Sequence, residues 1–180
     1  MATEAELIIR TLDRHLAGPA DIRLFGGAAL VLAYGLTRTT EDADLLMDDD
    51  ECSLLVDTAD FGNAVERTNE ELEPRGLYLT HIWGPEQQVL SPGWRARCRH
   101  APLDGLKHIR LSVLGPTDII VSKLARADEL DLQDISWLLR RENLAPARVW
   151  AEVDLAVVPA ILAEAFAQAR IRLARVLPRP

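Results

Sequence analysis

Residues 25–46 read FGGAALVLAYGLTRTTEDADLL. A glycine pair, Gly26 and Gly27, precedes a short and almost wholly apolar segment, and two aspartates, Asp42 and Asp44, lie near the end of the stretch. Glycines let backbone amides approach a phosphate, and paired carboxylates can hold a divalent metal ion. The stretch therefore contains both halves of a candidate phosphoryl-transfer site.

The two aspartates lie two residues apart on an expected strand over residues 42–47. Side chains at this spacing on a strand point to the same face. Neighbouring carboxylates repel each other unless a cation lies between them, and Mg²⁺ (or Mn²⁺) is bound by one or two carboxylates together with substrate phosphates. Taken singly, the aspartates also fit a solvated strand end, and the glycine pair also fits a tight strand-to-helix connection.

The composition is that of an ordinary globular protein. The chain has 180 residues, 48% apolar and 27% charged, with 20 basic and 28 acidic residues and a net charge of −8. An acidic chain is poorly suited to non-specific binding of DNA or of an anionic membrane. It has two cysteines without metal-ligand spacing, no signal-peptide pattern and no apolar run of spanning length. We expect a cytoplasmic protein that binds neither DNA nor membrane.

The periodicity of apolar residues predicts an α/β (α+β) protein with a small mixed sheet flanked by helices and a helical C-terminal half. We expect an α/β core over residues 1–114 and a helical region packed on it over residues 115–180. Strands are expected at 22–25, 42–47, 77–83, 94–98 and 108–114. Helices are expected at 3–17, 28–34, from an acidic cap at 48–51 to about 72, and at 115–126, 132–141, 146–152 and 159–176.

A glycine pair, a short helix and Arg-x-Thr-x-Asp-x-Asp, in this order and spacing, resemble the nucleotidyltransferase superfamily (the polymerase-β-like fold). In that family the glycine turn cradles a nucleoside triphosphate and the Asp-x-Asp pair holds Mg²⁺. The resemblance implies phosphate contacts by Gly26 and Gly27, metal ligation and catalysis by Asp42 and Asp44, and support of the nucleotide site by Arg38 and Thr40.

A second motif, KLARADELDLQDI, covers residues 123–135. It looks like the C-terminal motif of the abortive-infection type IV toxin nucleotidyltransferases, and residues 90–94 (LSPGW) resemble an uncharacterised bacterial branch of the superfamily. The resemblance implies that Lys123 binds phosphate, that Asp131 is the candidate general base and that Asp134 supports it. The spacing alone also fits Asp131 as a helix N-cap and Lys123 as a salt-bridge partner.

The chain departs from the superfamily pattern in one respect. Active members usually carry a third carboxylate on a later strand, but residues 94–99 read WRARCR and the next expected strand has no acid. Asp104 is the nearest acid and is expected in a turn. If residues 94–99 form a strand, their arginines share one face, which fits either a substrate-binding patch or a solvated surface.

Two functions follow from these patterns. The first is Mg²⁺-dependent transfer of a nucleotidyl group from a nucleoside triphosphate to a hydroxyl of RNA (tRNA) or protein, with a toxin–antitoxin pair as one setting. The alternative is a catalytically degraded nucleotidyltransferase fold that binds a nucleotide or a protein partner, as an antitoxin does. The missing third acid favours the alternative, and Lys123 and Asp131 favour the enzyme.

Overall fold

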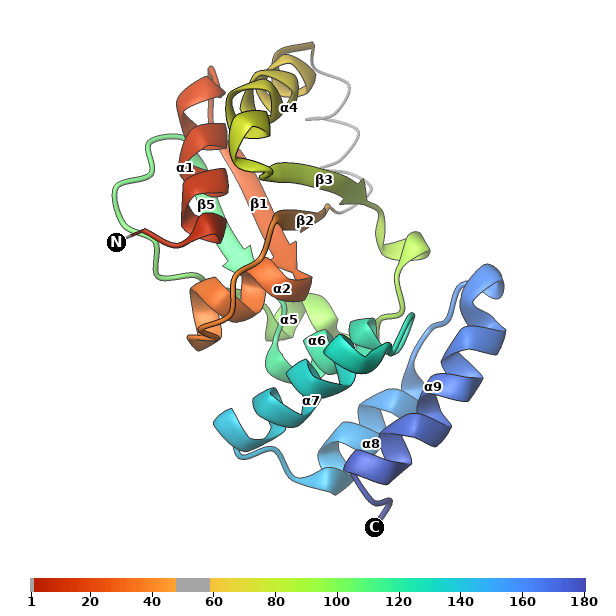
Figure 1. Ribbon diagram of the computed structural model, residues 1–180. Coiled ribbons are helices and arrows are strands. Elements are labelled where there is room, and N and C mark those ends of the chain that lie inside the picture. Colours follow the sequence, from red (N-terminus) through yellow and green to blue (C-terminus); the bar gives the residue numbers. More distant parts are fainter. Residues whose placement is uncertain (1, 48–58) are drawn as a thin grey trace. The chain divides into compact units, whose positions relative to one another are not determined.

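The structure is a computed structural model that describes residues 2–47 and 59–180 (Figure 1). The chain divides into two compact units, Met1–Gly84 with Arg99–Val113 and Pro85–Cys98 with Leu114–Pro180. The fold is mixed α/β, as the sequence predicted. Residues 85–98, which the sequence placed with the α/β core, make most of their contacts with the helical second unit.

The first unit is built on a mixed sheet, which has five strands within the described residues, in the order β3-β2-β1-β5-β4. β1 runs parallel to β5 and β2 runs parallel to β3, whereas the β1–β2 and β4–β5 pairs are antiparallel. The strands are β1 (Ala20–Phe25), β2 (Asp42–Leu46), β3 (Tyr78–Trp83), β4 (Arg99–His100) and β5 (Ile109–Val113).

Two helices, α1 (Glu4–His15) and α4 (Ala59–Leu72), pack against each other and contact strands β2 and β3 (Figure 1). The strands alternate in burial: Ile22 and Leu24 on β1 and Leu111 on β5 are buried, and the residues between them are more exposed. This period-two pattern gives the sheet one apolar face for the core and one polar face. The polar face is the one available for a site.

A short helical segment follows β1 directly. It consists of α2 (Gly26–Ala29) and a π-helical turn, η1 (Leu30–Tyr34), which ends at Gly35 in the left-handed conformation, with φ of 79°. The sequence predicted this helix, with a start two residues later. The 3₁₀ turn η2 (Glu73–Arg75) follows α4 in the same unit.

The second unit is helical. Its centre is α6 (Pro116–Lys123), all eight residues of which are buried, and α6 packs against α7 (Glu129–Arg141) and α8 (Pro146–Leu155). Helix α9 (Ala163–Val176) packs against α7. Short turns complete this unit: η3 (Pro85–Gln87), α5 (Trp94–Arg97) and η4 (Ala160–Leu162).

The strand predicted over 94–98 is wrong, because residues Trp94–Arg97 form helix α5 and β4 is only Arg99–His100. Gly93 precedes the helix in the left-handed conformation, with φ of 76°, which starts a turn that a strand could not contain. The Arg97 guanidinium is drawn inward to a buried carboxylate of helix α6. The arginines of 94–99 therefore do not share a strand face.

The acidic cap expected at 48–51, and the start of the helix it was to cap, lie outside the described residues; α4 confirms the later part of that helix. Over the described ranges, none of the helices combines the length and apolar character needed to cross a bilayer.

Candidate functional site

The glycine turn lies where β1 ends. Gly26 has φ of 66°, a left-handed conformation that residues with a side chain rarely adopt. A Cβ atom at Gly26 would lie 3.1 Å from Asp44 Oδ2, so the Asp44 carboxylate lies directly against the turn. The pairing of the strands brings Asp44 to this turn, because Asp44 and Phe25, the residue before Gly26, are Cα partners in the antiparallel β1–β2 pair.

Gly27 brings the Arg-x-Thr segment to the same turn. A Cβ atom at Gly27 would lie 2.9 Å from Thr40 Oγ1 and 3.3 Å from Arg38 Nη2. The first of these separations is closer than real Cβ atoms come to such a neighbour. The absence of a side chain at Gly27 is therefore what lets the Thr40 hydroxyl and the Arg38 guanidinium lie over the turn.

Thr40 also connects the turn to the first aspartate. Its Oγ1 lies 3.2 Å from Asp42 Oδ1 and 3.2 Å from the Asp42 backbone oxygen, within reach of donating a hydrogen bond to either. Asp42 and Asp44 are half-buried, whereas Ala43 and Leu45 are fully buried. The two carboxylates thus belong to the polar face of the sheet, as the spacing predicted.

We call these six residues the aspartate cluster. It joins two stretches of chain that the β1–β2 pairing and the contacts between α2 and β2 bring together. The structure brings all of its members together within the first unit: Gly26, Gly27, Arg38, Thr40, Asp42 and Asp44.

The polar face continues from the aspartate cluster across β1 to β5. Arg23 and Ser112 are Cα partners in the parallel β1–β5 pair, and so are Asp21 and Arg110. Partners in a sheet share a face, and Asp21 and Arg23 have the same parity on β1 as Phe25, the partner of Asp44. Arg110 Nε donates to Asp21 Oδ1 at 2.6 Å in an exposed ion pair.

The chemistry of the aspartate cluster suits a hard divalent cation. It offers oxygen donors from two carboxylates on one face, beside a turn whose space a Cβ would fill. Mg²⁺ favours such donors and takes its remaining ligands from water and phosphate oxygens. Within the described ranges, no three Asp, Glu, His or Cys side chains gather as a group that could hold a metal ion.

The third acid that the superfamily pattern places on a later strand has no counterpart on β3 or β5, because neither strand contains Asp or Glu. Asp21 is the acid of the neighbouring strand β1, and it pairs with Arg110. The stretch 94–97, where the superfamily pattern would place this acid, is a helix of the other unit. Asp104 lies in a turn, as predicted, followed by Gly105 with φ of 81°.

The second motif forms an ion cluster in the second unit, which we call the lysine cluster: Lys123, Asp131 and Asp134, which are buried, and Arg126, which is exposed. Lys123 Nζ, at the end of α6, donates to Asp131 Oδ1 at 2.8 Å and lies 2.8 Å from Asp134 Oδ2, both on α7. The side chains of the three residues are 7%, 2% and 3% exposed, so the ion pairs are shielded from water. The prediction that the two aspartates share a helix face is confirmed.

Arg126 adds a second cation to Asp131. Its Nε donates to Asp131 Oδ2 at 2.8 Å and its Nη2 donates to Asp131 Oδ1 at 3.0 Å. Burial by itself would raise the pKa of Asp131, but the Arg126 hydrogen bonds and the Lys123 charge outweigh it and leave the pKa below its ordinary value. Asp131 is therefore a carboxylate held ionised by two cations.

The interpretation of Asp131 as a helix N-cap is wrong, because the cap is Asp128. Asp128 Oδ1 accepts a hydrogen bond from the Asp131 backbone N–H at 2.9 Å, which leaves the Asp131 side chain for the cations. The salt-bridge interpretation of Lys123 is confirmed, but the pair is buried and not a surface pair. A second acidic residue three positions before Asp131 was the signal that could have identified the cap.

Sequence reasoning missed one buried polar group of the second unit. The Arg97 guanidinium donates through Nε to Asp118 Oδ2 at 2.8 Å and through Nη2 to Asp118 Oδ1 at 2.7 Å, and Asp118 is fully buried. Ser91 Oγ donates to the same carboxylate at 3.0 Å. Gly115 makes room for this packing, since a Cβ there would lie 2.7 Å from the Arg97 carbonyl oxygen.

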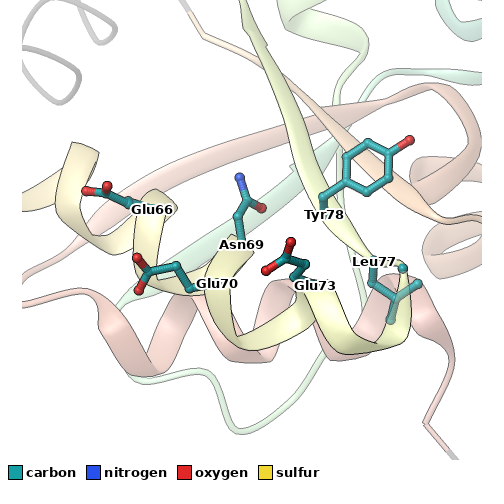
Figure 2. Close-up of a pocket in the computed structure, with 7 residues that line it drawn as sticks. Glu66, Asn69, Glu70, Glu73, Leu77 and Tyr78 are labelled. Carbon is teal, nitrogen blue, oxygen red and sulfur yellow. The ribbon is translucent and has the colours of Figure 1, made fainter.

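A hollow of about 490 Å³ lies in the first unit, at the end of α4 and the start of β3 (Figure 2). None of the predicted site residues lines it. Glu66, Glu70 and Glu73 line it together with Asn69 and Tyr78. The Asn69 side chain is committed to the sheet edge, because it accepts from the Leu79 N–H at 2.7 Å and donates to the Leu79 carbonyl at 3.1 Å.

A glycine turn held against an Asp-x-Asp strand, within a mixed sheet backed by helices, is the arrangement of a nucleotidyltransferase-like protein. The family model described as "Nucleotidyltransferase of unknown function (DUF6036)" matches residues 3–167, and the chain belongs to this family. No curated protein and no solved structure shows a significant match to it.

Proposed function

We propose that this protein transfers a nucleotidyl group from a nucleoside triphosphate to an acceptor hydroxyl, with Mg²⁺ (or Mn²⁺) as cofactor. Family membership supports nucleotidyltransferase chemistry in general terms. Mg²⁺-dependent transfer from a nucleoside triphosphate is supported by one observation above all. The Asp44 carboxylate lies against the glycine turn, and Thr40 and Arg38 lie over the same turn. The proposed phosphate-binding and metal-binding groups are thereby adjacent in one unit.

In the proposed reaction, the acceptor oxygen forms a bond to the α-phosphorus and the bond from that phosphorus to the bridging oxygen breaks, so pyrophosphate leaves. Asp42 and Asp44 would hold the metal ion, which neutralises phosphate charge and orients the triphosphate. The turn at Gly26 and Gly27 lets phosphate oxygens approach the backbone, and Arg38 supplies a fixed positive charge beside it.

Lys123 is the second proposed phosphate ligand, and Asp131 with Asp134 completes the second motif. The acceptor hydroxyl must lose its proton, and the family resemblance makes Asp131 the candidate base for this step. The acceptor is a hydroxyl of tRNA or of a protein, and a cognate toxin or antitoxin is a proposed partner in the cell.

The test is a double substitution, Asp42→Asn with Asp44→Asn. It removes both charges that would bind the cation while keeping the size of the two side chains. We expect Mg²⁺-dependent triphosphate affinity to fall about 100-fold or more, because a metal site without its carboxylate charges binds the cation far more weakly. Isothermal calorimetry or a fluorescent nucleotide analogue measures it, and circular dichroism confirms folding. Unchanged Mg²⁺-dependent affinity would exclude the proposed site.

Asp21→Asn is the matched control. It also removes a carboxylate from the polar face of the sheet, but from an exposed pair with Arg110. We expect triphosphate affinity within about twofold of wild type, since surface ion pairs contribute little. A loss equal to that of the double variant would mean that general negative charge, and not the aspartate cluster, determines binding.

A second candidate function rests on the absence of an acid from β3 and β5. On this alternative the protein binds a nucleotide or a protein partner without turnover. Incubation with each labelled triphosphate, Mg²⁺ and either total tRNA or cell protein distinguishes the two. Covalent label on one acceptor supports the enzyme and identifies its class. Binding without label transfer supports the alternative.

A further inference from the structure

We infer that Asp131 is a positioning residue that holds Lys123 in place and stays ionised, and that it is not the general base of the proposed reaction. The inference rests on the proposed function where it concerns the triphosphate, but its geometric part stands on the contacts of the lysine cluster alone. It replaces the role that family resemblance gives to Asp131 with one derived from the hydrogen bonds of this chain.

The first observation concerns the carboxylate oxygens. Asp131 Oδ1 accepts from both Lys123 Nζ at 2.8 Å and Arg126 Nη2 at 3.0 Å, and Oδ2 accepts from Arg126 Nε at 2.8 Å. A base must offer a lone pair to the acceptor hydroxyl and then carry its proton. Two cations oppose that protonation, because each interaction strengthens with the negative charge.

The second observation concerns the lysine. The chain contains 18 arginines but only two lysines, Lys107 and Lys123. Lys107 is exposed, whereas Lys123 is 8% exposed and lies between two carboxylates. An ammonium group has three donors, so Lys123 can keep Asp131 and Asp134 and direct the third donor to a phosphate oxygen.

The third observation concerns the supports of Asp131. Its backbone N–H is fixed by the Asp128 cap at 2.9 Å, and its carboxylate is gripped in a two-pronged manner by Arg126. A residue that is fixed through both its backbone N–H and its carboxylate is suited to hold the Lys123 ammonium in place. It is poorly suited to move as a general base that accepts and releases a proton.

The first test needs no activity. Limited acylation of amines in the full chain, followed by peptide mass spectrometry, gives the rate at Lys123 relative to Lys107 as an internal standard. We expect a low ratio in wild type and a rise of about tenfold or more in Asp131→Asn, because a charge-assisted bond to the ammonium is lost. Arg126→Gln, which leaves the Lys123–Asp131 bond in place, should change the ratio less than about threefold.

The second test separates the two roles by kinetics or by binding. If Asp131 is a positioning residue, Asp131→Asn should weaken triphosphate affinity about tenfold. The acidic limb of the plot of kcat against pH should then stay where it is in wild type. Asp131→Glu, which keeps the charge, should recover part of the affinity. Loss of a base should instead lower kcat and abolish that acidic limb.

An unchanged acylation ratio in folded Asp131→Asn overturns the inference, and so does loss of the acidic limb. If the wild-type protein binds no triphosphate, the proposed function fails, yet the acylation ratio still decides whether Asp131 holds Lys123. If Asp131→Asn does not fold, the acylation rate at Lys123 relative to Lys107 is measured in Asp134→Asn, which removes the other carboxylate from the same Nζ.

Discussion

The two clusters are built in opposite ways. The aspartate cluster is half-buried and arises from backbone features, namely a left-handed glycine and the alternation of a strand. In the lysine cluster, Lys123 and its two aspartates are buried and only Arg126 is exposed, and the cluster arises from ion pairs between neighbouring helices. An open cluster of this kind is suited to exchange ligands, whereas a closed ion network is suited to keep one side chain in a fixed position.

The two units also differ in charge. Residues 1–84 and 99–113 contain nine basic and eighteen acidic side chains, whereas residues 85–98 and 114–180 contain eleven basic and ten acidic ones. An acidic unit repels polyanions, which is consistent with the proposed metal ion at the aspartate cluster. The proposed RNA acceptor would meet less repulsion at the second unit than at the first.

If the second unit depends on buried ion pairs, its largest loss should come from Asp118→Ala. The change leaves the Arg97 guanidinium without the fully buried carboxylate that it now binds in a two-pronged manner. We expect the free energy of unfolding to fall by about 3–5 kcal/mol, as for other broken buried pairs. Urea denaturation measures it.

Glu152→Gln is the control for that variant. Glu152 Oε2 lies 3.3 Å from Arg97 Nη2, in a partly exposed pair, so a loss below about 1 kcal/mol is expected. Equal losses in the two variants would mean that burial of the ion pair is not what stabilises this unit.

If the first unit instead uses backbone geometry to form its site, Gly27→Ala should impair binding more than folding. The new Cβ would lie 2.9 Å from Thr40 Oγ1 and 3.3 Å from Arg38 Nη2, and it would displace both from the turn. We expect triphosphate affinity to fall about 10- to 100-fold, since overpacking moves neighbours by a fraction of an ångström. Nucleotide titration measures the affinity.

Gly62→Ala is the matched control on α4, where no atom lies within 4 Å of the added Cβ. It should leave affinity unchanged and raise the free energy of unfolding by about 0.5–1 kcal/mol, because alanine is the better helix residue. Full affinity in Gly27→Ala would show that the turn is only a connection.

A smaller loss of stability than in Asp118→Ala is expected at Asp13, a buried carboxylate of the first unit that binds backbone groups. Asp13 accepts hydrogen bonds from the N–H groups of Lys107, His108 and Ile109 at 2.8–2.9 Å. Burial by itself would raise the pKa of Asp13, but these three donors and the charge of His108 outweigh it and leave the pKa lowered. Asp13→Asn should cost about 1–3 kcal/mol of the free energy of unfolding.

The sign of the pH dependence follows from that lowered pKa. The stabilisation is fully present above the ordinary carboxyl pKa of about 3.9, and it is lost as the pH falls through the lower pKa of the folded state. Over the range from neutral pH to pH 3, the difference in thermal stability between wild type and Asp13→Asn should therefore narrow once the pH falls below about 3.9. A constant difference over that range would contradict this account.

Most elements of the fold could be predicted from local pattern, and the strand expected at 94–98 is the exception. The alternation of residues 42–46 and the glycine breaks at positions 26 and 35 are short-range features, and both were predicted or lie next to predicted boundaries. The sequence WRARCR alternates as a strand does, but its first four residues form a helix. Gly93 precedes this helix in the left-handed conformation, and Arg97 forms an ion pair with the buried Asp118. The residue that decides this lies 21 positions away from Arg97.

By itself, the sequence determined the glycine break before the short helix and the shared face of Asp42 and Asp44, because strand parity and glycine conformation depend on neighbours along the chain. Only the tertiary structure decided that Asp44 lies against Gly26, that Asp128 and not Asp131 caps α7, and that Lys123 is gripped by two buried carboxylates. Strand register and buried ion pairs depend on which elements pack together, and no local pattern specifies that.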